Sequence, residues 1–266
     1  MKFHIVGINK SSLNTYKLLK KKKFKVTISD QKKYKDLTKK VKLSKKEKNF
    51  YYENHPNQIL KSANKIIYST GVIKEIEDYK DYNKSNKKIS EIDLFNKFAK
   101  WPPRNILFVT GSRGKTSVCK KIYNTLNKKK IFKKVFYLDR NKYNFSNLPN
   151  FKKNYFLIAE VDYQSLLLAK SVFAKYRIIT SFIKTENKAF KSQNLYLKAK
   201  LKIFANLKQR DYIFTSNQTF KKLKKDIESF KNKVILVNEG KSIKKTNDNF
   251  TSTITNIIEK NLNAKY

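Results

Sequence analysis

The sequence predicts an α/β protein that is built on parallel sheets and divided into two units along the chain. Short apolar strands alternate with helices through the 266 residues, and this alternation is typical of parallel βαβ units. A loop with two glycines, residues 110–117, lies between an apolar strand and a helix and is called here the glycine loop. Trp101-Pro102-Pro103 follows a predicted helix. Because paired prolines cannot continue a helix, we place the boundary between the units there.

The first unit, residues 1–100, is predicted to be an N-terminal Rossmann-like domain with a parallel sheet. Gly7 follows the first strand, and Asp30 stands at the end of the second. The second and third glycines of a dinucleotide-binding loop are missing, so the pyrophosphate fingerprint is not met. The predicted strands are residues 2–6, 25–28 and 65–69, and the predicted helices are residues 12–20 and 90–98.

The second unit, residues 101–266, is predicted to be a central ATP-binding α/β domain of the P-loop type. The glycine loop opens this unit, and a later strand ends in Glu160. The predicted strands are residues 106–109, 135–138, 155–159, 177–183, 212–215 and 233–237. The predicted helices are residues 117–126, 163–169, 192–207 and 250–261.

Each residue of the glycine loop has a physical reason to be there if the loop binds phosphate. Gly111 and Gly114 let the backbone approach an anion closely, and Lys115 carries a charge to the terminal phosphates. The Thr116 hydroxyl suits Mg²⁺, and the N-terminus of the following helix favours an anion. The loop is shorter than the strict P-loop, because Val109 stands where that motif has its first glycine. The alternative is a lysine-rich turn that contains two glycines by chance.

The net charge of +42, from 62 basic and 20 acidic residues, allows two interpretations. A strongly basic chain can bind nucleic acid. Lysine spread over the whole chain, beside abundant Asn, Ile and Tyr, instead indicates drift in an AT-rich coding sequence. Five of the basic residues are arginines, and proteins that read bases depend on arginine. We therefore expect nonspecific attraction to nucleic acid and other polyanions at low salt, without dedicated nucleic-acid binding.

The sequence also bears on location. The N-terminus begins with a strand instead of a charged segment followed by an apolar one, and no apolar run approaches about 18 residues. The single cysteine, Cys119, excludes an internal disulfide and fits a reducing compartment. It follows the glycine loop in a predicted helix and is expected to be a packing residue. We expect a cytoplasmic protein with no membrane partner.

With these positions placed, several segments of the chain resemble segments of the Mur ligases. The resemblance is strongest to the ligases that add D-glutamate to UDP-N-acetylmuramoyl-L-alanine. Its most specific parts are the glycine loop, similar to T-G-x-x-G-K-T, and the run from Tyr196 to Phe204, similar to Y-x-x-A-K. The other matching positions are Ser69-Thr70-Gly71-Val72 with Thr70 in place of a proline, Ser90-Glu91-Ile92-Asp93-Leu94-Phe95, Asn141, Glu160 and the helix near residues 249–258.

The resemblance implies an ATP-dependent amide ligase of peptidoglycan precursor synthesis. Such a ligase phosphorylates a carboxylate with ATP, and an amine then attacks the acyl phosphate. The implied catalytic residues are Lys115, Glu160 and Lys200, and the implied Mg²⁺ ligands are Thr116, Glu160 and, after carbamylation, Lys200. The implied residues that bind ATP or orient substrate oxygens are Gly111, Ser112, Arg113, Gly114, Lys115, Thr116, Ser117 and Asn141. The implied partners are a UDP-linked muramoyl substrate and an amino acid.

The chain departs from the family pattern in three places. Residues 185–190 lack the family's D-H-x-D segment, and Lys188 stands where the metal-associated histidine is found. A charged ammonium cannot ligate Mg²⁺. Residues 162–165 are one residue shorter than the corresponding family segment. The chain stops at Tyr266, which leaves no residues for the third domain that binds the amino acid and closes over ATP.

These departures leave three interpretations open. The first is a D-glutamate-adding ligase reduced to its UDP-binding and ATP-binding domains. The second is a catalytically impaired nucleotide-binding pseudo-ligase, or half of a split ligase whose C-terminal domain is a separate chain. The third is a basic protein that binds polyanions or nucleic acid.

Overall fold

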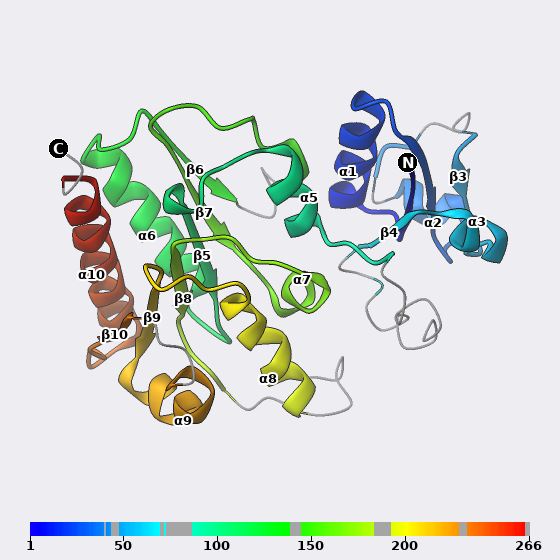
Figure 1. Ribbon diagram of the computed structural model, residues 1–266. Helices are drawn as coiled ribbons and strands as arrows, with labels where there is room; N and C mark the ends of the chain where they lie inside the picture. The colour runs from blue at the N-terminus through cyan, green and yellow to red at the C-terminus, as the bar shows by residue number, and fades with distance from the viewer. Residues whose placement is uncertain are drawn as a thin grey trace.

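The computed structural model confirms an α/β fold with two sheets, and all neighbouring strands within each sheet are parallel (Figure 1). The structure describes residues 1–39, 41–43, 48–69, 72, 87–138, 145–183, 193–228 and 233–263. Residues 70–71, 139–144 and 184–192, which include several predicted positions, lie outside this description.

The N-terminal sheet has four strands in the order β3-β2-β1-β4. Its strands are β1 (Lys2–Val6), β2 (Lys25–Ser29), β3 (Phe50–Tyr51) and β4 (Lys65–Tyr68), and its helices are α1 (Lys10–Lys21), α2 (Tyr34–Thr38) and α3 (Asn57–Ser62). Helix α1 begins in a capping box, since the Asn9 side chain accepts from the Ser12 N–H while the Ser12 hydroxyl accepts from the Asn9 N–H. The predicted Asp30 follows β2, and its carboxylate accepts the backbone N–H of Ile8 at 2.7 Å.

The larger sheet has six strands in the order β10-β9-β8-β5-β7-β6. Its strands are β5 (Ile106–Thr110), β6 (Lys134–Leu138), β7 (Tyr155–Glu160), β8 (Tyr176–Ile179), β9 (Tyr212–Ser216) and β10 (Lys233–Val237). The helices that follow these strands, with the short 3₁₀ turns, are η2 (Pro103–Asn105), α6 (Lys115–Lys128), η3 (Phe145–Asn147), α7 (Tyr163–Leu168), α8 (Gln193–Leu201), η4 (Lys202–Phe204), α9 (Asn217–Glu228) and α10 (Ile243–Asn263).

The six-stranded sheet is the middle of three layers, because successive residues of its strands face opposite sides. Leu107 and Val109 of β5 pack with α6 and α10 on one side. Ile106 and Phe108 pack on the other side with α7 and α8, which Figure 1 places opposite α6 and α10. A strand buried on both faces is apolar throughout, which is why the run before the glycine loop could be recognised from the sequence.

Several elements differ from the sequence prediction, and the short elements α2, α3 and β3 were not predicted. The predicted strand 177–183 is shorter, at Tyr176–Ile179. The predicted helix 192–207 is α8 up to Leu201 and then the 3₁₀ turn η4. The last helix begins at Ile243 instead of residue 250. The prediction missed its first turns because they are mostly lysine and asparagine and have no apolar residues at helical spacing. Helix α9 was not predicted, although Thr219, Leu223 and Ile227 form a buried stripe along it.

Helix α5 (Glu91–Phe98) connects the two parts of the structure. Glu91 accepts the Ser11 hydroxyl of α1 at 2.6 Å. Ser90 is the N-cap of α5, and the Asp93 carboxylate accepts its backbone N–H in a capping box. Asp93 also accepts the backbone N–H of Ser171 at 3.0 Å. These neighbouring carboxylates therefore hold α5 to the N-terminal sheet through α1 and to the larger sheet through the segment before β8.

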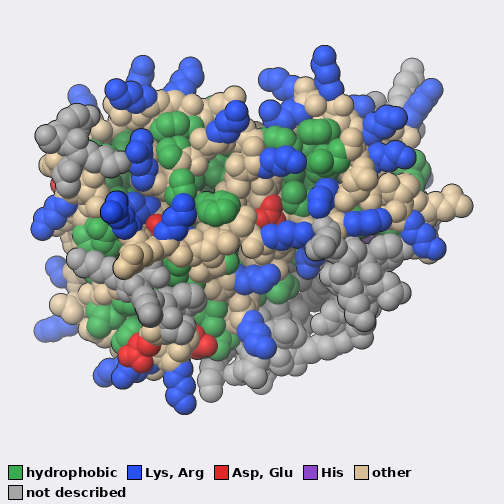
Figure 2. All heavy atoms as spheres, in the orientation of Figure 1, with side chains coloured by type: hydrophobic (Ala, Val, Ile, Leu, Met, Phe, Trp, Pro, Cys, Tyr) green, Lys and Arg blue, Asp and Glu red, His purple; other side chains and the backbone are tan. Residues whose placement is uncertain are grey.

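Lysine and arginine side chains are spread over the described part of the face seen in Figure 2, with few acidic ones among them. This dispersion agrees with the even distribution of lysine in the sequence. Among the described residues, no helix combines the length and the apolar character that crossing a membrane requires.

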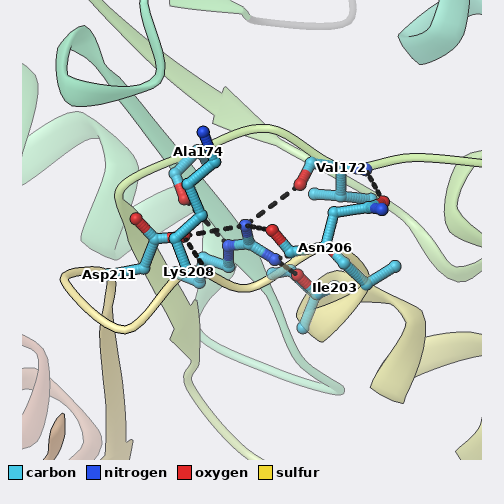
Figure 3. Close-up of polar contacts among 8 residues, drawn as sticks. Val172, Ala174, Ile203, Asn206, Lys208 and Asp211 are labelled. Carbon is cyan, nitrogen blue, oxygen red and sulfur yellow. Dashed lines mark hydrogen bonds and ion pairs between the residues drawn. The ribbon is translucent and has the colours of Figure 1, made fainter. Parts of the chain in front are cut away.

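Arg177 is buried in β8, with none of its surface exposed. Its guanidinium donates to backbone carbonyls on both sides and to Asp211 at 3.3 Å, and Figure 3 shows these acceptors converging. The carbonyl acceptors are those of Val172, Ala174, Ile203, Ala205 and Asn206, at 2.7 to 3.4 Å. Burial lowers the pKa of Arg177 to about 10 and Asp211 opposes that shift, so the side chain stays charged at neutral pH. Arg177 thus joins the segment before β8 to the turn after α8.

His4 is buried in the centre of the N-terminal sheet and belongs to a chain of polar side chains. The Thr27 hydroxyl donates its one hydrogen to the Phe3 carbonyl. It must therefore accept the hydrogen bond that joins it to Nδ1 of His4 at 2.8 Å. Nε2 of His4 then accepts from the Ser29 hydroxyl at 2.8 Å, and Ser29 accepts from His55 at 2.6 Å. This assignment requires neutral His4. Burial, with His55 as a smaller cause, lowers the pKa of His4 to about 4.

We expect Arg177→Ala to lower the free energy of unfolding by about 3–5 kcal/mol, because buried carbonyls and the Asp211 carboxylate lose their donor. Arg177→Lys should also destabilise the protein, since one ammonium cannot reproduce the fork of donors. The measurement is urea unfolding followed by circular dichroism. Arg104→Ala, at an exposed position, is the control and should change the free energy by less than about 0.5 kcal/mol. Equal stability of Arg177→Lys and the wild type would contradict this role.

We expect His4 to make stability fall as the pH falls. The pKa of His4 is about 6.5 when unfolded and about 4 when folded, so the unfolded state gains a proton first on acidification. Stability from this group is complete above pH 6.5 and decreases as the pH approaches 4, by about 2.5 kcal/mol at pH 4.5. Urea unfolding from pH 7.5 to 4.5 measures the loss, and His4→Gln should have a shallower dependence. Identical slopes in the two proteins would show that His4 is not the cause.

Candidate functional site

The strand order brings three loops to one edge of the larger sheet. β5 lies between β7 and β8, and all three are parallel, so their carboxyl ends point the same way. In a parallel sheet, a crevice for ligands opens at the carboxyl ends of two neighbouring strands whose following connections run to opposite sides of the sheet. The glycine loop after β5, Glu160 at the end of β7 and Thr180 after β8 meet at this edge.

The two glycines of the loop occupy positions that other residues would not tolerate. Gly111 has φ of +148° and Gly114 has φ of +84°, and both values lie in the region that favours glycine. A Cβ on Gly111 would lie 2.1 Å from the hydroxyl oxygen of Thr180. Gly114 is the N-cap of α6 and lies against Asn247. The loop is therefore packed tightly between β8 and the start of α10.

Residues that follow β8 brace the glycine loop. The Arg113 N–H donates to the Ser181 hydroxyl at 2.8 Å, and the Thr180 hydroxyl donates to the Arg113 carbonyl at 2.6 Å. The Ser112 N–H donates to the Ser181 carbonyl at 2.9 Å. These contacts hold the loop in its bent shape before any ligand arrives.

The first residues of α6 face the end of β7. The Thr116 hydroxyl donates to Oε2 of Glu160 at 2.7 Å. Nζ of Lys115 lies 3.9 Å from Oε1 of Glu160 and donates to the Gly111 carbonyl at 2.9 Å. The side chains of Lys115 and Glu160 are 19% and 13% exposed. A hydroxyl, an ammonium and a carboxylate thus meet at the helix N-terminus, where an anion is favoured.

Lys200 of α8 is a buried lysine beside this group, with 2% of its surface exposed. Its Nζ lies 4.7 Å from the centre of the Tyr196 ring. Burial lowers the pKa of Lys200 to about 7, the positive charge of Lys115 lowers it too, and Asp162 opposes them. A large share of Lys200 is therefore the neutral amine at physiological pH, which an exposed lysine is not.

Two cavities adjoin the glycine loop. One of about 630 Å³ is lined by Ser112 to Ser117, by Lys121 and by the start of α10. The other, of about 440 Å³, lies between the segments after β8 and β10 and the N-terminal end of α9. Both are lined by Arg113, Gly114, Ile243 and Asn247. The two cavities therefore lie next to each other on either side of these shared residues.

The structure brings together Gly111, Ser112, Arg113, Gly114, Lys115, Thr116, Ser117, Glu160 and Lys200. Asn141 and Lys188 lie outside the described residues, and so do Thr70 and Gly71. Cys119 is buried in α6, and burial raises the pKa of its thiol, in agreement with a packing residue.

Sequence reasoning missed Thr180, Ser181 and Asn247, which complete the walls of the site. Thr180 and Ser181 fell within an overlong predicted strand, and no pattern marks them. Asn247 was missed because the last helix was predicted to begin after it. The available signal was its position two residues before the segment 249–258, which resembles the family's asparagine-containing helix.

The fold and this site define an α/β domain that presents a glycine loop and a helix N-terminus to a phosphate. Residues 109–263, more than half of the chain, match the Mur ligase middle domain. The chain therefore belongs to the Mur ligase family, whose members are ATP-dependent amide ligases of peptidoglycan precursor synthesis that act on UDP-muramoyl substrates. No curated protein sequence matches the chain. The match does not distinguish the D-glutamate-adding ligases from the rest of the family.

One solved structure of a Mur ligase shares the fold at a TM-score above 0.5, and two others are similar over less of their length. UDP-N-acetylmuramate:L-alanyl-gamma-D-glutamyl-meso-diaminopimelate ligase from Neisseria meningitides is 13% identical, with 91% of this chain and 81% of that chain covered and a TM-score of 0.52. MurC from Thermotoga maritima is 17% identical, with coverage of 91% and 53% and a TM-score of 0.47. MurF from Thermotoga maritima, in complex with ADP, is 13% identical, with coverage of 89% and 48% and a TM-score of 0.44. The chain thus spans about half the length of the latter two.

We expect Lys115→Ala to weaken the binding of ATP by at least about 100-fold, because the variant lacks the positive charge that would attract the terminal phosphates at the glycine loop. Isothermal titration calorimetry with ATP and Mg²⁺ measures the affinity. Lys120→Ala is the matched control, since Lys120 is exposed on the same helix and should bind ATP as the wild type does. Unchanged affinity in Lys115→Ala would contradict the placement of phosphate at this loop.

Proposed function

We propose that this chain carries the nucleotide-sugar and ATP sites of a Mur-type ligase that adds D-glutamate to UDP-N-acetylmuramoyl-L-alanine. The observation that supports this proposal best is the group formed by Lys115, Thr116 and Glu160, with the buried amine of Lys200 beside it. The D-glutamate substrate rests on the resemblance of the sequence.

ATP is proposed to lie along the two neighbouring cavities. Its phosphates accept hydrogen bonds from backbone N–H groups of the glycine loop and sit at the N-terminus of α6, where unpaired N–H groups and the helix dipole favour negative charge. Lys115 lies beside the terminal phosphates. The base and ribose occupy the 440 Å³ cavity on the far side of Arg113 and Gly114, near Asn247 and Thr219.

The residues present fit Mg²⁺, a hard cation that prefers oxygen ligands and keeps several waters. The Thr116 hydroxyl and the Glu160 carboxylate are oxygen donors 2.7 Å apart. The described part of the chain has no cluster of three or more His, Cys, Asp or Glu side chains suited to a metal. Phosphate oxygens and water would therefore complete the coordination, and the ion would neutralise charge on the reacting phosphate.

The proposed reaction is the one that the resemblance to the Mur ligases implies. A carboxylate oxygen of the muramoyl substrate attacks the γ-phosphorus of ATP, and the bond to the β-phosphate oxygen breaks to release ADP. The amine of D-glutamate attacks the carbonyl carbon of the acyl phosphate, loses a proton, and phosphate leaves. Both reactants of the first step are anions, so Lys115 lowers the barrier by stabilising charge that develops between them.

Lys200 is proposed to react with carbon dioxide. Its neutral amine attacks the carbon of CO₂, a proton is released, and a carbamate with one negative charge results. The partly neutral amine at physiological pH meets the requirement for this attack. The new anion would face Lys115 and add a third oxygen donor beside Thr116 and Glu160, the kind of ligand that Mg²⁺ prefers.

Ligase activity is tested with the chain, ATP, UDP-N-acetylmuramoyl-L-alanine and D-glutamate. We expect release of phosphate that depends on both substrates, and a loss of at least about 100-fold in Glu160→Gln, which lacks the carboxylate charge. Lys198→Ala, at an exposed position of α8, is the control. Turnover with another amino acid would overturn the D-glutamate assignment. ATP binding without turnover would favour a nucleotide-binding pseudo-ligase or half of a split ligase.

Carbamylation is tested separately by ¹³C NMR of the protein in ¹³C-bicarbonate near pH 7.5. We expect one protein carbamate signal that is lost in Lys200→Ala and kept in Lys198→Ala. The contrast follows from burial, which keeps the amine of Lys200 largely neutral while Lys198 is exposed. A signal that survives in Lys200→Ala, or no signal in the wild type, would contradict the proposal without bearing on ATP binding.

A further inference from the structure

A third cavity lies at the junction of the two parts of the structure, away from the glycine loop. Its volume is about 590 Å³, and it is bounded by α1, the end of α5 and the segment 145–150. None of its described lining residues lines either cavity of the nucleotide site. Cavities of this size typically hold small molecules, and nothing in the proposed ligase reaction uses this one.

One wall of the junction cavity is basic. Lys17 and Lys21 of α1 line it together with Lys22, the residue directly after the helix. The spacing of four residues puts Lys17 and Lys21 on one side of the helix. Lys22 also lies 5.2 Å from the centre of the Phe98 ring. No aspartate or glutamate occurs among the lining residues that the structure describes. The three ammonium groups therefore produce a positive potential that a bound anion would relieve.

The floor of the junction cavity is apolar and aromatic. Phe95, Phe98 and Leu94 of α5 line it together with Phe145 and Leu148. The rings of Phe95 and Phe145 lie 5.3 Å apart. An apolar floor and a charged wall fit a ligand that has a hydrophobic body and an anionic group, because the body is removed from water while the charge meets the lysines.

The cavity is held in shape by polar contacts from both parts of the structure. The indole N–H of Trp101 donates to the Pro149 carbonyl at 3.0 Å, and the Phe151 N–H donates to the Ala99 carbonyl at 3.2 Å. Between α1 and η3, the hydroxyls of Thr15 and Ser146 are 2.5 Å apart. A ligand would therefore enter a preformed site and would lose little affinity to rearrangement.

The geometry points to a second ligand site in this cavity, for a small organic anion with an aromatic or aliphatic body. The charged group, a carboxylate, phosphate or sulfonate, lies beside Lys17 and Lys21, and the body lies over Phe95 and Phe98. Because α1 belongs to the N-terminal sheet and the segment 145–150 to the larger one, the ligand would tie the two parts together. This site is independent of the proposed ligase activity.

The test uses 8-anilinonaphthalene-1-sulfonate, an aromatic anion that fluoresces in apolar surroundings, with the full chain. Trp101 is the single tryptophan of the chain, and its ring lies 6.3 Å from Phe95 of the cavity floor. A probe bound in the cavity should quench Trp101 by energy transfer. We expect saturable one-to-one binding in which Trp101 emission falls with the same dissociation constant as probe fluorescence rises.

Two double variants are compared, one on α1 at the cavity and one on α9 away from it. Each replaces two lysines four residues apart with glutamate. Lys17→Glu/Lys21→Glu should weaken the probe by at least about tenfold, since attraction becomes repulsion. Lys221→Glu/Lys225→Glu, on exposed positions of α9, should change the affinity by less than about twofold. Equal losses in both variants would show general attraction to a basic protein and overturn the site, and so would binding that leaves Trp101 unquenched.

The uncharged relative N-phenyl-1-naphthylamine separates the two halves of the site. It should bind the wild type more weakly than the sulfonate does, and Lys17→Glu/Lys21→Glu should leave its affinity within about twofold, because only the charged group faces the lysines. Equal binding of the two probes to the wild type would show that the lysine wall does not recognise the anion and would contradict the proposal. Far-UV circular dichroism of each variant confirms that it is folded.

Discussion

The candidate site depends on the parallel pairing of β5 with β7 on one side and β8 on the other. This pairing places Val109 opposite Glu160 and Thr110 opposite Ile179. The glycine loop therefore leaves the sheet between a carboxylate and the residues that follow β8. Thr180 then packs so closely against Gly111 that a side chain at that position has no room. The loop is shaped by its neighbours in the sheet as much as by its own glycines.

Two buried cations in the larger part of the structure show how surroundings decide the state of a charge. Arg177 and Lys200 are both almost inaccessible to solvent. Arg177 is surrounded by carbonyl oxygens and Asp211, and it remains charged. Burial, together with the nearby positive charge of Lys115, lowers the pKa of Lys200 to about 7, within the physiological range. A buried cation whose N–H groups are all hydrogen-bonded stays charged and stabilises the fold. A buried cation without such partners loses its proton more easily, and its neutral amine can then act as a nucleophile.

Helix α5 gives the molecule its second organising feature. Its first residues place Glu91 against α1 and Asp93 against the segment before β8. Its last residues form the floor of the junction cavity with Phe95 and Phe98. The same helix therefore fixes how the two sheets sit together and shapes the space between them. The resemblance placed this segment on a family motif without indicating that it holds the two parts together.

Local sequence patterns were sufficient for the class of fold, the strands before the glycine loop and before Glu160, and the loop itself. Continuous apolar runs predict strands buried on both faces, and this information is contained in a few neighbouring residues. The polar first turns of α10 gave no such signal, so its start and Asn247 could not be placed. Thr180 and Ser181 became part of the site only because β8 pairs with β5. The burial of Lys200, one of many lysines, and the lysine wall over an aromatic floor were likewise decided by tertiary structure, because pKa and cavities depend on groups that are distant in the chain.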